Sequence, residues 1–73
     1  MKYLYHLKST AYYYNYAIEG TCQLSLAFPR GIYVRAYSFK QATLYIKRQI
    51  AIHDMVRYND IDIDNNDIEL IEG

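Results

Sequence analysis

The sequence predicts an α+β domain, with an antiparallel meander of three or four strands followed by one long helix packed on one face. Apolar residues recur at helical spacing only over residues 38–58. Before that stretch, period-two alternation marks four strand-like segments at about 2–8, 11–18, 21–28 and 31–37. The chain also has ten tyrosines and no tryptophan, and tyrosine favours strands. At 73 residues, it is expected to form one small domain.

The start of the helix is marked by Ser38 and Gln41, which stand in the spacing of a capping box. One broad arc of the helix is apolar and is expected to pack on the sheet: Phe39, Ala42, Tyr45, Ile46, Ile50, Ile52 and Val56. His53 falls on the same arc, where we expect a hydrogen-bonded core histidine rather than a ligand or a base.

A second, narrower apolar line runs along another side of this helix. Leu44, Ala51 and Met55 form the line, with Arg48 in its middle. One helix in so short a chain has one core to cover, so the second line indicates a partner, most simply a second copy. The sequence therefore predicts a homodimer or higher oligomer with these four residues in the interface. Scattered surface apolar residues, which are common, are the other interpretation.

Turn signals divide the strand segments. The alternation changes sides at Lys8-Ser9-Thr10, so residues 2–18 form either two strands or one bent strand. Phe28-Pro29-Arg30-Gly31 has the residue preferences of a type I turn. In the third segment the residues expected to face the core are Cys22, Leu24, Leu26 and Phe28.

The charge is divided sharply along the chain. Up to Tyr58 there are eight basic and two acidic residues, whereas from Asn59 onward there are six acidic residues and no basic one. We therefore separate a basic domain, residues 1–59, from an acidic tail or short final strand, residues 60–73. This pattern indicates a polyanion-binding surface with a tail that masks it or binds a partner. Solubility alone is the other explanation.

Most catalytic chemistry is not indicated. The one cysteine, Cys22, excludes an intrachain disulfide and a multi-cysteine zinc site. Asp60, Asp62 and Asp64 have the spacing that opens an EF-hand loop, but the required glycine and final glutamate are missing. Phosphate-binding and nucleophile motifs are also missing. We expect a non-enzymatic protein with no cofactor or metal, no membrane partner and a cytoplasmic location.

The most positive signal is the outward face of the predicted sheet. Tyr13, Tyr33, Arg35 and Tyr37 are expected to share this face, so aromatic and basic side chains alternate on it. Single-stranded nucleic acid needs this combination, because bases stack on aromatic rings while cations follow the phosphates. Tyrosine that simply favours strands is the other interpretation.

The segments YAIEGTCQLSLAF, as a second hairpin, and SFKQATLYIKRQIA, as the start of the helix, carry a resemblance of element order. Over residues 2–59 the order resembles the coactivator/Whirly class of single-stranded-DNA-binding folds. The resemblance implies a basic sheet, nucleic-acid binding and a dimer. Some very small phage and gut-bacterial proteins that inhibit CRISPR nucleases are similar in size and element order, which implies a mobile-element role. The strand-turn-helix run also resembles the DNA-binding arm of tyrosine-type integrases.

Two functions of different classes follow from these patterns. The first is a dimeric module that binds single-stranded nucleic acid through the tyrosine-rich face. The second is a protein-binding inhibitor or regulator of phage type, in which Asp60, Asp62 and Asp64 of the tail dock on a basic groove of a partner.

Overall fold

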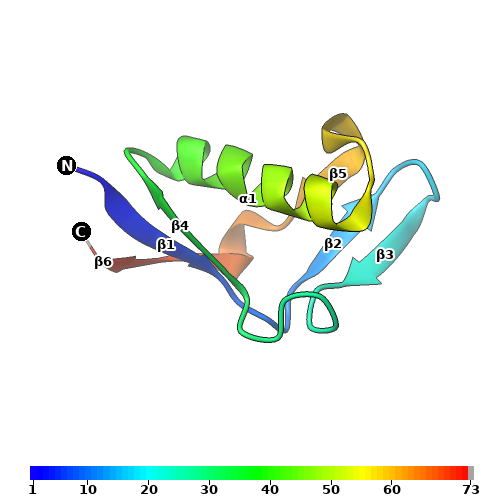
Figure 1. The fold of residues 1–73 in the computed structure, drawn as a ribbon, viewed down its shortest axis with the longest axis horizontal. Coiled ribbons are helices and arrows are strands. Elements are labelled where there is room, and N and C mark those ends of the chain that lie inside the picture. Colours follow the sequence, from blue (N-terminus) through cyan, green and yellow to red (C-terminus); the bar gives the residue numbers. More distant parts are fainter. Residues whose placement is uncertain (73) are drawn as a thin grey trace.

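The structure is a computed structural model that describes residues 1–72, and it is an α+β fold with two small antiparallel sheets under one helix (Figure 1). The first sheet has the strand order β4-β1-β6, formed by Ile32–Ala36, Tyr3–Leu7 and Ile68–Glu72. The second has the order β3-β2-β5, formed by Gly20–Gln23, Tyr12–Asn15 and Ile61–Ile63. The helix α1, Phe39–Asp54, lies along the long axis of the molecule and spans both sheets.

The predicted fold class is confirmed, but the single meander is wrong. β1 pairs with β4 instead of with β2, because the chain turns a corner after Lys8, where the Ala11 N–H donates to the Lys8 carbonyl at 3.1 Å. β2 then forms a hairpin with β3 in a separate sheet. Residues 2–18 therefore form two strands that belong to two different sheets. The alternation of residues indicated where the strands lie, but it could not indicate which strands pair.

The helix begins where the sequence predicts and ends earlier than predicted. Ser38 is the N-cap, and its hydroxyl accepts from the Gln41 N–H at 3.1 Å, while the Gln41 side chain accepts from the Tyr37 N–H at 2.8 Å. The helix ends at Asp54 because Met55 takes a left-handed conformation, with φ 56°. The predicted continuation to residue 58 is therefore wrong.

The core lies between the helix and the inner faces of both sheets. From α1 it includes Ala42, Ile46 and Ile50. From the first sheet it includes Tyr5, Leu7, Ile32, Val34, Ala36 and Ile68. In β4 buried and exposed residues alternate, and in β1 Tyr5 and Leu7 are buried, which matches the one buried face of an antiparallel sheet.

In β2 and β3, which follow the corner after Lys8, the expected inward and outward faces do not hold. Tyr13 and Asn15 of β2 are buried, although Tyr13 was expected on the outward face, because a change of one residue in strand parity exchanges the two faces. β3 ends at Gln23, since Leu24 starts a tight turn in which its carbonyl accepts from the Ala27 and Phe28 N–H groups. Leu24 is buried but Leu26 is exposed, so the predicted alternation to residue 28 is wrong.

The acidic C-terminal segment is part of both sheets. A short 3-10 turn, η1 (Tyr58–Asp60), leads into β5, which pairs with β2, and a second, η2 (Asn65–Asp67), leads into β6, which pairs with β1. The β1–β6 ladder has one irregularity between Leu4 and Tyr5. The start of β1 and the end of β6 thus lie side by side at one end of the first sheet, where Leu4 is opposite Glu72 (Figure 1). Within residues 1–72, no helix is long and apolar enough to cross a membrane.

The turn before β4 gives a direct test of the fold. Gly31 has φ 78°, and its N–H donates to the Phe28 carbonyl at 2.9 Å, as the predicted turn requires. A Cβ at this position would lie 2.1 Å from the Leu7 carbonyl oxygen. Gly31→Ala should therefore lower the free energy of unfolding by at least about 2 kcal/mol in a urea titration.

Gly20→Ala is the matched control for this substitution. A Cβ at Gly20 would meet only ordinary contacts, the nearest at 3.7 Å, so the change in stability should be small. Equal effects of the two substitutions would contradict the described turn.

Candidate functional site

The exposed side of β1 and β4, opposite α1, brings together three of the four residues predicted to bind nucleic acid. We call this surface the outer face and define it by Lys2, His6, Tyr33, Arg35 and Tyr37. Tyr33 and Arg35 point away from the core because the residues that alternate with them in β4, Ile32, Val34 and Ala36, are buried. Tyr37 directly follows β4 and is also exposed.

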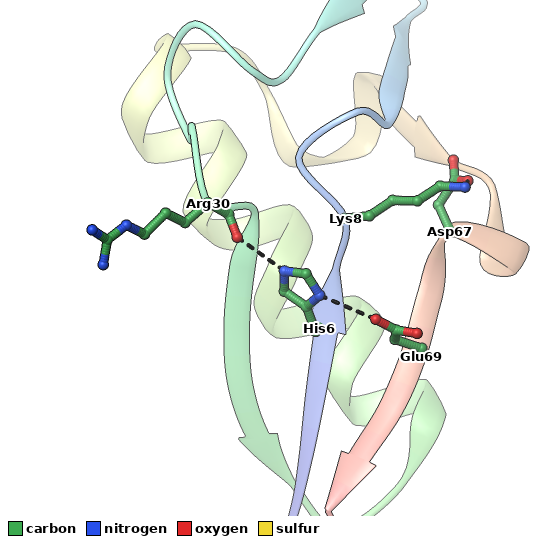
Figure 2. Close-up of polar contacts among 5 residues, drawn as sticks. All are labelled: His6, Lys8, Arg30, Asp67 and Glu69. Atoms are coloured by element: carbon green, nitrogen blue, oxygen red, sulfur yellow. Dashed lines mark hydrogen bonds and ion pairs between the residues drawn. The ribbon is translucent and has the colours of Figure 1, made fainter.

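His6 and Tyr33 form a stacked pair at the centre of the outer face. The two residues are cross-strand partners, with ring centroids 4.1 Å apart and planes inclined by 20°. Figure 2 shows that His6 is held on both sides: Nε2 donates to the Arg30 carbonyl at 2.9 Å, and Nδ1 lies 3.3 Å from a carboxylate oxygen of Glu69. Because a carbonyl oxygen can only accept, Nε2 is the donor in the contact to Arg30.

The charges around this pair come from several elements. The Lys2 ammonium lies 5.5 Å from the centroid of the Tyr37 ring, within the range of a cation–π contact. Arg35 is opposite Leu4 across the β1–β4 ladder. Lys8 is instead paired with Asp67 at 3.2 Å, and this ion pair lies beside the His6 contacts in Figure 2.

Tyr13, the fourth predicted residue, does not lie on the outer face. It is buried in the second sheet, where its hydroxyl donates to Asp54 at the end of α1. His53 Nδ1 donates to the same carboxylate at 2.8 Å. His53 itself is exposed, so the expectation of a core histidine is wrong.

The Tyr13–Asp54 contact shifts the pKa of both groups. Burial first, and then the hydrogen bond to Asp54, raise the pKa of Tyr13 far above its ordinary value of 10.0. For Asp54, burial favours the neutral acid, but hydrogen bonds from Tyr13 and His53 outweigh it and lower the pKa below 3.8. The pair therefore favours a protonated phenol and an ionised carboxylate, which stabilises the junction of α1 and β2.

The residues predicted for a dimer interface are not all equivalent in the structure. Arg48 and Met55 are exposed, whereas Ala51 packs partly against the core. Leu44 is half-buried and lines a groove on the flank of α1. The four residues remain a predicted interface, but only Leu44 belongs to a concave surface.

The predicted partner-binding tail residues are fixed by local structure. Asp60 precedes β5, and its carbonyl accepts from the Tyr16 N–H at 2.8 Å. Asp62 is exposed on β5, where it accepts from the Tyr16 hydroxyl at 3.4 Å. Asp64 accepts from the Asn66 N–H at 2.9 Å and caps η2. These carboxylates lie on a folded edge rather than on a free arm.

In the described chain, residues 1–72, there is no group of three or more His, Cys, Asp or Glu side chains placed to hold a metal ion. Cys22 is a half-buried free thiol that packs against the core.

Lys2 and His6 were missing from the predicted site. Their importance depends on the β1–β4 pairing, which puts His6 opposite Tyr33. The sequence could not identify Glu69 as a residue of the site, because only the folded structure brings β6 beside β1. Comparison of this chain with protein-family models, with curated proteins and with solved structures gave no match.

Removing the Tyr13 hydroxyl gives a stability test with a definite pH dependence. Tyr13→Phe should lower the free energy of unfolding by about 1 to 2 kcal/mol at neutral pH, because Asp54 loses a charge-assisted donor. A raised pKa in the folded state adds stability below pH 10.0 that is lost as the pH rises above it. The difference in the free energy of unfolding between parent and variant, measured by denaturant titration, should therefore become smaller above pH 10.0.

The matching change on the acidic side is Asp54→Asn. A lowered carboxyl pKa adds stability that is present above pH 3.8 and lost as the pH falls below it, so the gap between parent and this variant should narrow in acid. If the differences in the free energy of unfolding stay constant in both acid and alkali, the Tyr13–Asp54 hydrogen bond is contradicted.

Proposed function

We propose that this protein is a small binding module that holds single-stranded nucleic acid against the outer face. The observation that supports this most is the His6–Tyr33 stack, which is held in place by contacts to the Arg30 carbonyl and Glu69. One side of the Tyr33 ring meets His6, and the side chain keeps 54% of its surface exposed. A base that stacks on a ring already fixed in position loses little conformational freedom in the protein.

The spacing of the outer face also fits an extended strand of nucleotides. Residues two apart on a β-strand lie about 6.6 Å from each other, so Tyr33, Arg35 and Tyr37 alternate aromatic, basic and aromatic groups at that interval. No acidic partner lies within salt-bridge distance of Lys2, Arg30 or Arg35 among residues 1–72. These three cations are therefore free to contact phosphates while the tyrosine rings contact bases.

A second candidate function is a protein-binding inhibitor or regulator, and the outer side of the second sheet favours it. Tyr14, Tyr16 and Asp62 gather there, with the two rings 4.8 Å apart. The Asp62 charge raises the pKa of Tyr16, as expected in a negative local potential. Such a surface suits a basic segment of a partner.

Asp62→Asn should then weaken the binding of an arginine-rich peptide, and unchanged binding argues against this function.

The first candidate predicts binding that depends strongly on salt. Three phosphate contacts on a single strand give a slope of about −2 in a plot of log affinity against log salt. Fluorescence anisotropy of a labelled mixed-sequence oligonucleotide measures this slope directly. A slope near zero, or no binding at low salt, would contradict the proposal.

Substitution of one tyrosine locates the site. Tyr33→Ala should weaken binding by about 1 to 3 kcal/mol, because one stacking platform is lost. The matched control is Tyr12→Ala on the second sheet, since Tyr12 is 53% exposed and Tyr33 is 54% exposed. Equal losses in the two variants would show that binding is not located on the outer face.

A further inference from the structure

A groove of about 740 Å³ runs along the flank of α1, on the helix side of the first sheet and away from the outer face. Its apolar surface comes from Phe39, Leu44 and Tyr58, and its polar surface includes Lys40, Lys47 and Asn65. The volume is in the range of binding pockets. In the described part of the chain no acidic residue lines it, so the groove is apolar and positive.

The two lysines are placed to meet negative charge along the length of the groove. Lys40 and Lys47 are seven residues apart on one helix, which separates them by about 10.5 Å along its axis, and Leu44 lies between them. The Lys47 ammonium is 5.6 Å from the centroid of the Tyr58 ring. This contact holds the charge at the border of the groove.

The strand β6 offers a surface of the opposite kind. It is an edge strand that pairs on one side only, with β1, in the chain as described. Leu70 and Ile71 are 57% and 48% exposed on it, and Glu72 follows them. It has neither lysine nor proline, which natural edge strands use to prevent further pairing. This edge is therefore apolar and negative, and it is open to a partner.

We propose that the groove receives the β6 edge of a second copy of this chain, in a two-fold symmetric dimer. The groove and the edge lie on the same flank, because Asn65 lines the groove and β6 begins three residues later, at Ile68. One two-fold axis can therefore place each edge in the groove of the other copy at once. The charges are complementary: Lys40 and Lys47 on one copy meet Glu72 on the other.

A pair of charge variants tests this arrangement. The first variant is Lys40→Glu with Lys47→Glu, and the second is Leu70→Lys with Glu72→Lys. In each variant alone, groove and edge carry like charge, so the dimer dissociation constant should rise about a hundredfold. When the two variants are mixed, each groove faces an edge of opposite charge, so a heterodimer should form. Light scattering after size exclusion measures the masses, against 8.7 kDa for one chain.

Arg48→Glu separates this dimer from the interface predicted along the helix: Arg48 is exposed and lies outside the groove, so a dimer formed through the groove should stay intact in this variant. Circular dichroism melting curves establish that each variant is folded. A monomeric parent at all concentrations would overturn the proposal. So would charge variants that stay dimeric, a mixture that forms no heterodimer, or a dimer that only Arg48→Glu disrupts.

Discussion

The backbone pairing of the acidic C-terminal segment with β1 and β2 is the interaction on which the rest of the structure depends. Without β5 and β6, each sheet would be a two-stranded ribbon, and such ribbons are marginally stable in water. The segment also supplies Ile61, Ile63 and Ile68 to the core beneath α1. A chain of this size has little apolar area to spare, so these strands belong to the folding unit although their composition is that of a solvated tail.

The same pairing distributes the charge of the protein. Folding brings Asp67 to Lys8 and Glu69 to His6, so carboxylates of the acidic segment lie against side chains at the end of β1. Lys2, Arg30 and Arg35 keep no such partner within the described residues. The acidic segment thus completes the candidate binding face, since Glu69 orients the histidine that supports the tyrosine.

The sequence predicted local structure well wherever one physical rule was sufficient. Ser38 and Gln41 located the helix start, and period-two alternation located β1 and β4. Pairing partners could not be predicted, because alternation is the same in a meander and in two sheets. Tyr13 was misplaced for this reason: its face depends on the corner after Lys8, and its hydroxyl needs Asp54 from a distant helix. The end of α1 was missed because Met55 adopts a left-handed conformation without being glycine.

Hydrogen–deuterium exchange of the backbone amides in β5 and β6 tests the central claim most directly, because it reports whether the acidic segment is paired in solution. The amides that bond to β1 and β2 should be protected to the same extent as those of β1 and β2 themselves, since all belong to one cooperative unit. Exchange of residues 61–63 and 68–72 at the rate of an unstructured peptide, while β1 and β4 stay protected, would contradict the account.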